Sequence, residues 1–465
     1  MKLISNLYEY QKEAVEKLCH VKVGALYMEM GTGKTRTALE LIHRRLVSEK
    51  VRQVLWLCPF SISRDLSELI GEHAEDFENV IRIAGIESLS ASIKLYYDLI
   101  QYVQYAPTYL IVDESLLVKN PFAYRTIRIY EISKKCPYKL ILNGTPVSKN
   151  EADLFSQWYI LDWRILGYQS YYSFSANHLE MDPERPGHVV RVLNKDYLAR
   201  KISPYTYQCR KEDVLNLPPK WYFSRCFSLL PEQEQLYNEA SQILLEQVDE
   251  LKPETIYRLF SCLQAITSGL CIEFSKNHMF SKAVPFLNAK ENPRIKILLK
   301  TLDEFSKEQA VIYCKYTQEI LDIVSVLGEK AVPFYGNISV SERQKNKTNF
   351  KNGKAQYMVA NKSCAKFGLN LQFSCREIFY NNDWDWGTRA QAEDRVHRAG
   401  QTKDVYIYDI FAANTIDESI LSCLSRKENL SEIFKKSMAI HNRETLKQKI
   451  YAAIAGHLEK ERHNE

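Results

Sequence analysis

Glycine and proline are scarce in this chain. The 16 glycines and 15 prolines are about 7% of its 465 residues, against an average of about 12%. This scarcity excludes collagen-like repeats, long flexible linkers and low-complexity tails. The 11 cysteines are scattered and no two have the CxxC spacing. We therefore expect no disulfide framework and no structural zinc site. We expect free buried thiols in a reducing compartment instead.

Long apolar runs are also missing. No run approaches the roughly 18 residues that span a membrane, and the first residues, MKLISNLYEYQKE, lack the apolar core of a signal peptide. The excess of positive charge is small: a formal net charge of +5 permits a polyanionic partner without requiring one. We expect a soluble intracellular protein of the cytoplasm or nucleoid that has no membrane partner.

Short apolar runs alternate with amphipathic stretches in the two outer parts of the chain. We predict strands at residues 25–28, 54–57, 109–112 and 139–142, and again at 310–314, 331–334, 357–360, 377–380 and 405–410. This alternation predicts an α/β fold with two parallel sheets and crossover helices. Residues 151–293 instead show helical periodicity with few strand signals, and the tail from Thr415 is helical.

These patterns predict four regions. The first α/β lobe covers residues 1–205, of which 151–205 form a helical extension. A linker and helical insertion cover 206–292, the second α/β lobe covers 293–414, and a C-terminal helical brace covers 415–465.

A candidate phosphate-binding loop lies between a predicted strand and a predicted helix. Its residues are Gly31, Thr32, Gly33, Lys34 and Thr35. Glycines allow backbone N–H groups to face phosphates, the lysine reaches the terminal phosphates, and the threonine hydroxyl is a ligand for Mg²⁺. Met28 occupies the place of the first glycine of the full pattern, and five residues of this kind also occur by chance in glycine-rich turns.

Two adjacent acids, Asp113 and Glu114, follow another predicted strand. A carboxylate there can hold Mg²⁺ through water, and a second can orient an attacking water. Alone, such a pair is usually a solvated turn. Arg395 and Arg398 are three residues apart, so on a helix they would share one face and serve as arginine fingers, or form a charged face paired with Glu393 and Asp394.

The chain resembles the Swi/Snf-type DNA-dependent ATPases of helicase superfamily two, and the matching segments run in order over nearly its whole length. They are LYEYQ (7–11, Q-motif), MEMGTGKT (28–35, motif I), WLCPFSI (56–62, motif Ia), DESLLVKN (113–120, motif II), LNGTPVSKN (142–150, motif III), CRKEDVLNLPPK (209–220), AVIYCKYTQEILDIV (310–324, motif IV), YGNISVSER (335–343), SCAKFGLNLQFS (363–374, motif V), QAEDRVHRAGQ (391–401, motif VI) and ANTIDESIL (413–421).

The resemblance implies two RecA-like lobes and a motor that hydrolyses ATP with Mg²⁺ and moves along double-stranded or branched DNA, generally without separating the strands. It implies that Gln11 contacts the adenine base. The candidate DNA contacts are Ser61, Ser63, Lys119, Lys366 and Asn370. The lack of recognisable accessory domains favours a bacterial or viral source.

Three features depart from the family pattern or leave alternatives open. Leu116 replaces the histidine of motif II, and Ala365-Lys366 replaces the paired glycines of motif V. Trp384 and Trp386 are interpreted first as packing residues and second as a DNA-facing element. Two other functions stay open: a strand-separating DNA or RNA helicase, and a DNA clamp that binds nucleotide without hydrolysing it.

Overall fold

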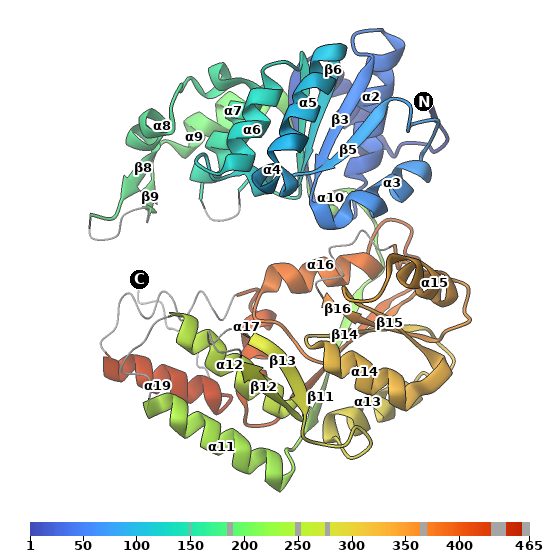
Figure 1. Cartoon of the computed structure of the whole chain (residues 1–465), viewed down its shortest axis with the longest axis vertical. Coiled ribbons are helices and arrows are strands. Elements are labelled where there is room, and N and C mark those ends of the chain that lie inside the picture. Colours follow the sequence, from blue (N-terminus) through green and yellow to red (C-terminus); the bar gives the residue numbers. More distant parts are fainter. Residues whose placement is uncertain are drawn as a thin grey trace. The chain divides into compact units, whose positions relative to one another are not determined.

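The computed structural model describes residues 1–147, 150–183, 189–246, 253–274, 280–362, 370–428 and 443–457. The chain divides into two compact units, Met1–Asn216 and Leu217–Glu465 (Figure 1). Each unit is built on a six-stranded sheet whose neighbouring strands all run parallel. The predicted α/β fold with two parallel sheets is confirmed. Among the described residues, no helix has both the length and the apolar character needed to cross a lipid bilayer.

The sheet of the first unit has the strand order β10-β2-β7-β6-β3-β5. The strands are β2 (Val23–Met28), β3 (Gln53–Cys58), β5 (Ile81–Gly85), β6 (Thr108–Asp113), β7 (Tyr138–Asn143) and β10 (Thr206–Cys209). Every residue of β3 and β6 is buried, as expected for central strands that are covered on both faces.

Helices cover both faces of this sheet. On one face α1 (Glu9–Cys19), α2 (Lys34–Val47) and α3 (Ser63–Gly71) pack against alternate strand residues such as Trp56 and Ile111. On the other face α5 (Ile93–Tyr105), α6 (Tyr124–Ser133) and α7 (Ala152–Leu166) pack against Leu55, Val112 and their neighbours. The remaining elements of the unit are β1 (Lys2–Leu3), β4 (Ala74–Glu75), α4 (Ser88–Ala91), α8 (Tyr171–His178), β8 (Leu179–Met181), β9 (Val189–Val192), α9 (Lys195–Ile202) and α10 (Lys211–Val214).

The sheet of the second unit has the order β11-β18-β17-β14-β16-β15. Its strands are β11 (Lys220–Phe227), β14 (Ala310–Cys314), β15 (Ala331–Phe334), β16 (Tyr357–Asn361), β17 (Arg376–Phe379) and β18 (Val405–Ala412). One face packs against α13 (Pro293–Asp303) and α14 (Thr317–Leu327). The other packs against α15 (Val340–Lys351) and α16 (Trp386–Val396).

A separate helical cluster completes the second unit. It joins α11 (Pro231–Glu246) and α12 (Pro253–Thr267) to the C-terminal helices α17 (Ile416–Ser425) and α19 (Arg443–Ile454) (Figure 1). The Tyr237 hydroxyl donates to the Ile454 carbonyl and accepts from the Ile416 N–H, each at 2.8 Å. Trp384 and Trp386 are partly buried and pack against this cluster, so their interpretation as packing residues is confirmed.

The expectation of few strands between residues 151 and 293 is wrong. Besides β10 and β11, this region holds β8, β9, β12 (Leu270–Phe274) and β13 (Phe280–Pro285). The sequence signal is weak because β10 has only four residues, while β11 is an edge strand that exposes four consecutive side chains. An edge strand with mixed exposure lacks the alternation that identifies a half-buried strand.

Candidate active site

Four of the predicted motifs meet at one edge of the first sheet. The loops after β2, β3, β6 and β7 carry motifs I, Ia, II and III, and the strands that precede them run parallel. Carboxyl ends of parallel strands meet at the same sheet edge, where α/β proteins bind their ligands. The fold therefore places these four loops along one edge.

The loop after β2 has the backbone of a phosphate-binding loop. Gly31 and Gly33 both have φ of +81°, in the left-handed region that favours glycine. Gly33 is the residue that precedes α2, and Lys34 and Thr35 form its first turn. The unpaired N–H groups and the dipole of a helix N-terminus attract anions, so this end of α2 suits a phosphate.

Gln11 anchors this loop from α1. Its Nε2 donates to the carbonyl of Thr32 at 3.0 Å, while its Oε1 accepts from the N–H of Tyr8 at 3.0 Å. The Tyr10 hydroxyl donates to the same Thr32 carbonyl at 2.9 Å. A Cβ on Gly33 would lie 2.3 Å from Gln11 Nε2, so a side chain there would displace the Gln11 amide in addition to straining the backbone at a positive φ.

Lys34 and Asp113 interact electrostatically although they come from different loops. The Lys34 ammonium donates to the carbonyl of Met28 at 2.8 Å. Burial raises the pKa of Asp113 to about 7, the Glu114 carboxylate adds to this rise, and Lys34 opposes it. The lysine of motif I and the first acid of motif II thus share one electrostatic environment.

Asp113 has few partners for a buried carboxylate. Its Oδ1 accepts from the Glu114 N–H at 2.9 Å, and its Oδ2 accepts from the Trp56 indole at 3.4 Å. Since its pKa is raised, its charged form needs a cation close by. A carboxylate and the Thr35 hydroxyl are hard oxygen donors of the kind Mg²⁺ takes, so these residues fit that ion.

Glu114 has a strained backbone. Its φ of +49° and ψ of +53° are left-handed, although it is not glycine. Such conformations cost of order 1–3 kcal/mol and cluster at functional sites. This half-buried carboxylate lies directly after Asp113 on the carboxyl edge of the sheet.

The candidate DNA contacts of the first unit lie on the loops after β3 and β6. Ser61 is exposed, and the Ser63 hydroxyl donates to the Phe60 carbonyl at 3.0 Å. Lys119 Nζ lies 3.7 Å from Asp153 Oδ1. Lys119 therefore contacts α7, consistent with a role in bracing the motif II loop.

In the second unit Arg395 and Arg398 do not share a helix face. Helix α16 ends at Val396, and Arg398 lies beyond it. The chain turns here because Gly400 has φ of +97° and the His397 ring contacts the Pro218 carbonyl at 2.8 Å. This corrects the expectation from the spacing.

Arg398 instead contacts the end of motif V. Its guanidinium donates to the Asn370 side-chain carbonyl. Two of the predicted second-unit residues are thereby brought together, while Lys366 lies outside the described residues.

The alternative interpretation, in which Glu393 pairs with these arginines, is wrong for Glu393. Glu393 accepts instead from Arg389 and Lys220, each at 2.7 Å, and from the Tyr222 hydroxyl at 3.0 Å. Arg389 in turn contacts Asp409 at 2.5 and 3.1 Å. This buried network ties α16 to β11 and β18.

Two polar residues near the site were not found from the sequence. Trp56 donates to Asp113, and Gln157 on α7 contacts the motif II and motif III loops. Trp56 lies within the motif Ia segment, but its contact with Asp113 depends on the pairing of β3 with β6. No sequence signal identified Gln157, whose contacts depend on how α7 packs.

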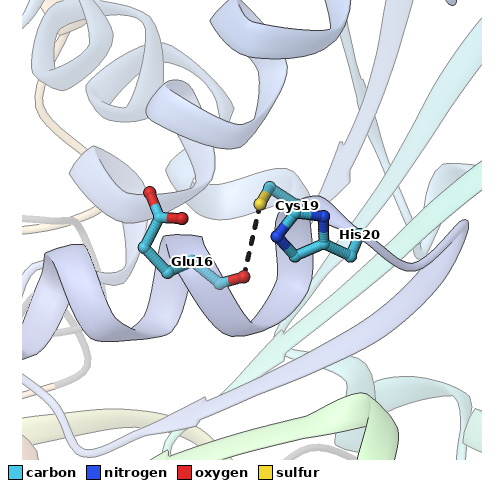
Figure 2. Close-up of side chains that lie close together, drawn as sticks. All are labelled: Glu16, Cys19 and His20. Atoms are coloured by element: carbon cyan, nitrogen blue, oxygen red, sulfur yellow. Dashed lines mark hydrogen bonds between the residues drawn. The ribbon is translucent and has the colours of Figure 1, made fainter.

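A group of possible metal ligands lies apart from this site, at the end of α1. Glu16, Cys19 and His20 each offer a ligand atom within 4.8 Å of the others. Figure 2 shows the Cys19 thiol directed at the Glu16 backbone carbonyl, 3.2 Å away. The Glu16 carboxylate pairs with Arg44 at 2.7 Å. We assign no metal to this group because its acid already has a cationic partner and three ligands fall short of a closed zinc site.

Comparison with known families gives two matches. The SNF2-related domain matches residues 72–270, and the helicase conserved C-terminal domain matches residues 293–400. Together the two models match about two thirds of the chain.

Among curated proteins, the chain is 24% identical over 90% of its length to the TATA-binding protein-associated factor mot1 of Aspergillus fumigatus, of which it spans 26%. It is 22% identical over 91% of its length to an uncharacterized ATP-dependent helicase of Bacillus subtilis, YqhH, of which it spans 78%. Among solved structures, the SWI2/SNF2 ATPase core of Sulfolobus solfataricus in complex with dsDNA is 21% identical, with 98% of each chain covered and a TM-score of 0.40.

Proposed function

The chain belongs to the Swi/Snf-type, SNF2-related family of helicase-like ATPases, and from this premise we propose that it is a DNA-dependent ATPase. It hydrolyses ATP with Mg²⁺ when it binds duplex or branched DNA, and it uses the energy to move along DNA and to remodel DNA structures or protein–DNA complexes. The observation that carries this proposal is the electrostatic environment shared by Lys34, Asp113 and Glu114 at one sheet edge.

The residues of this edge have distinct proposed roles. Backbone N–H groups of Gly31, Thr32 and Gly33, with the Lys34 ammonium, bind the phosphates. Thr35 and Asp113 hold Mg²⁺, partly through water, and the ion when bound neutralises phosphate charge. Glu114 orients the attacking water.

Gln11 is proposed to read the adenine base while it holds the loop. A carboxamide has two N–H donors and two acceptor lone pairs. The contacts with Thr32 and Tyr8 use one of each, so one donor and one lone pair remain for a base.

Residues of the second unit complete the proposal. Arg395 and Arg398 supply positive charge to the phosphates during hydrolysis, the role that the resemblance implies for motif VI. Ser61, Ser63, Lys119, Lys366 and Asn370 are proposed to contact the DNA backbone. Backbone contacts carry no sequence information and weaken with salt, so binding should tolerate any sequence and fall steeply between about 50 and 200 mM salt.

The test is ATP hydrolysis by the wild type and Glu114→Gln without nucleic acid and with single-stranded, duplex or forked DNA, or RNA. Strong stimulation by duplex or forked DNA, lost in Glu114→Gln but kept in the exposed control Glu78→Gln, is the expected result. Stimulation only by single strands or RNA would instead indicate a strand-separating helicase. ATP binding without turnover on any substrate would indicate a clamp.

A further inference from the structure

Leu116 cannot provide a side-chain hydrogen bond between the loops that carry motifs II and III. The resemblance places a histidine at that position of motif II, and leucine has no polar side-chain atom with which to replace it. Any hydrogen-bonded link between the loop after Asp113 and the loop after Asn143 therefore has to use other side chains.

Gln157 of α7 makes that link. Its Oε1 accepts from the Ser115 hydroxyl at 2.6 Å, and Ser115 directly follows Glu114. Its Nε2 donates to the Pro146 carbonyl of motif III at 3.0 Å and to the Asp153 carbonyl of its own helix at 2.8 Å. One side chain thus contacts both loops.

The contacts are buried and specific. Both Gln157 and Ser115 have 0% of their surface exposed, so water does not replace a lost hydrogen bond. Breaking one such bond leaves a buried polar group unpaired, which costs more than an exposed bond is worth. A shift of either loop therefore strains the hydrogen bonds by which Gln157 contacts the other loop.

Helix α7 holds the far end of the motif II loop as well. The Ser156 hydroxyl donates to the Lys119 carbonyl at 3.1 Å, and Lys119 lies 3.7 Å from Asp153. With Gln157, these contacts fix the loop at Ser115 and at Lys119. The motif II loop is thus attached at two points to the part of α7 that precedes its kink at Asp162.

We propose that Gln157 is a positioning residue that couples the motif II loop to the motif III loop, in place of a polar residue at Leu116. It acts through Ser115 on the setting of Glu114 and through Pro146 on motif III. The coupling rests on the proposed function, because its purpose is to transmit the presence of nucleotide from one loop to the other.

The kinetic test uses Gln157→Met, which keeps the side-chain length but removes both hydrogen-bonding ends. We expect the KM for ATP to stay within about twofold and the DNA-stimulated kcat to fall about tenfold. The matched control is Gln53→Met, since Gln53 is a buried glutamine whose amide also binds backbone carbonyls, those of Tyr102 and Ala106, away from the motif loops. Equal losses in the two variants, or an unchanged kcat in Gln157→Met, would overturn the coupling.

A double-mutant cycle with Ser115→Ala tests the link itself. If Ser115 and Gln157 act as one unit, the double variant loses no more kcat than the worse single variant. Ser133→Ala is the serine control, because the buried Ser133 hydroxyl donates to the Tyr130 carbonyl of its own helix, away from the motif loops. Multiplicative losses in the cycle would contradict a shared role.

Hydrogen exchange of the full chain with ADP and beryllium fluoride separates this proposal from the proposed function. The analogue should protect residues 30–37 in the wild type and Gln157→Met, and residues 143–147 only in the wild type. Protection of 143–147 in both proteins, or in neither, would overturn the coupling alone. No protection of 30–37 in the wild type would overturn the nucleotide site, and the coupling with it.

Discussion

Two buried carboxylates, one in each unit, show opposite electrostatics. Asp113 on β6 has its pKa raised to about 7 because burial and Glu114 outweigh Lys34. Glu393 on α16 is also buried, yet Arg389 and Lys220 outweigh that burial and lower its pKa. The comparison separates a carboxylate whose cationic partners outweigh its burial from one for which a single lysine does not.

The largest effect expected from this comparison is on catalysis. Lys34→Ala removes the positive charge that acts on Asp113 and that we propose binds the phosphates, so ATP hydrolysis should fall by more than about 10³-fold. Steady-state hydrolysis with saturating duplex DNA measures this loss. Turnover near that of the wild type would show that the loop after β2 is not the phosphate site.

Removing the paired network should reduce stability. Arg389→Met leaves Glu393 and Asp409 buried without their shared cation, and the free energy of unfolding of the second unit should fall by about 3–5 kcal/mol. Arg426→Met is the control, because the Arg426–Glu428 pair is partly exposed and should contribute less than about 1 kcal/mol. Denaturant unfolding of both variants checks this, and equal small losses would contradict a structural role for the network.

The raised pKa of Asp113 predicts a pH dependence of stability. The folded protein holds this proton up to about pH 7, whereas the unfolded chain releases it near pH 4, so stability falls as pH rises between these values. Asp113→Asn removes the buried charge and should stabilise the magnesium-free protein by about 4 kcal/mol at about pH 8, and by little at about pH 4. Unfolding curves at the two pH values measure the difference; an equal gain at both would contradict the shift.

The smallest predicted effect concerns the contact between Gly33 and Gln11. Gly33→Ala and Gly353→Ala both place a side chain at positive φ, which costs about 1–2 kcal/mol. The Gly33 variant also meets a neighbour, Gln11 Nε2, while no atom of the described residues lies within 4 Å of a Cβ on Gly353. The free energy of unfolding, measured by thermal unfolding, should therefore fall by about 1 kcal/mol more in the Gly33 variant. Identical losses in the two variants would mean that the Gln11 side chain moves aside without cost.

The sequence predicted the parts of this molecule that depend on local patterns. Strands such as Ala310–Cys314 and Ala331–Phe334 have the predicted bounds because each is a continuous apolar run that packs on both faces. The glycines beside Lys34 were recognisable because left-handed backbone favours that residue type. Spacing could not show that α16 ends before Arg398, since the turn depends on Gly400 and on His397 contacting Pro218.

Contacts between distant segments could not be predicted from the sequence. Gln157 lies 42 residues from Ser115, and their bond exists only because α7 packs beside the loop after β6. Trp56 and Asp113 likewise meet because β3 pairs with β6. Gln157 belongs to no recognised motif, and the motif Ia segment that contains Trp56 does not indicate its contact with Asp113.

The most direct test of the central claim is calorimetric titration of a non-hydrolysable ATP analogue into the wild type and Asp113→Asn, with and without Mg²⁺. Asp196→Asn, at an exposed position of α9, is the control. We predict that Mg²⁺ strengthens binding to the wild type and the control but not to Asp113→Asn. Equal strengthening by Mg²⁺ in all three proteins, or no binding by the wild type, would contradict the assignment of this sheet edge as the Mg²⁺ and ATP site.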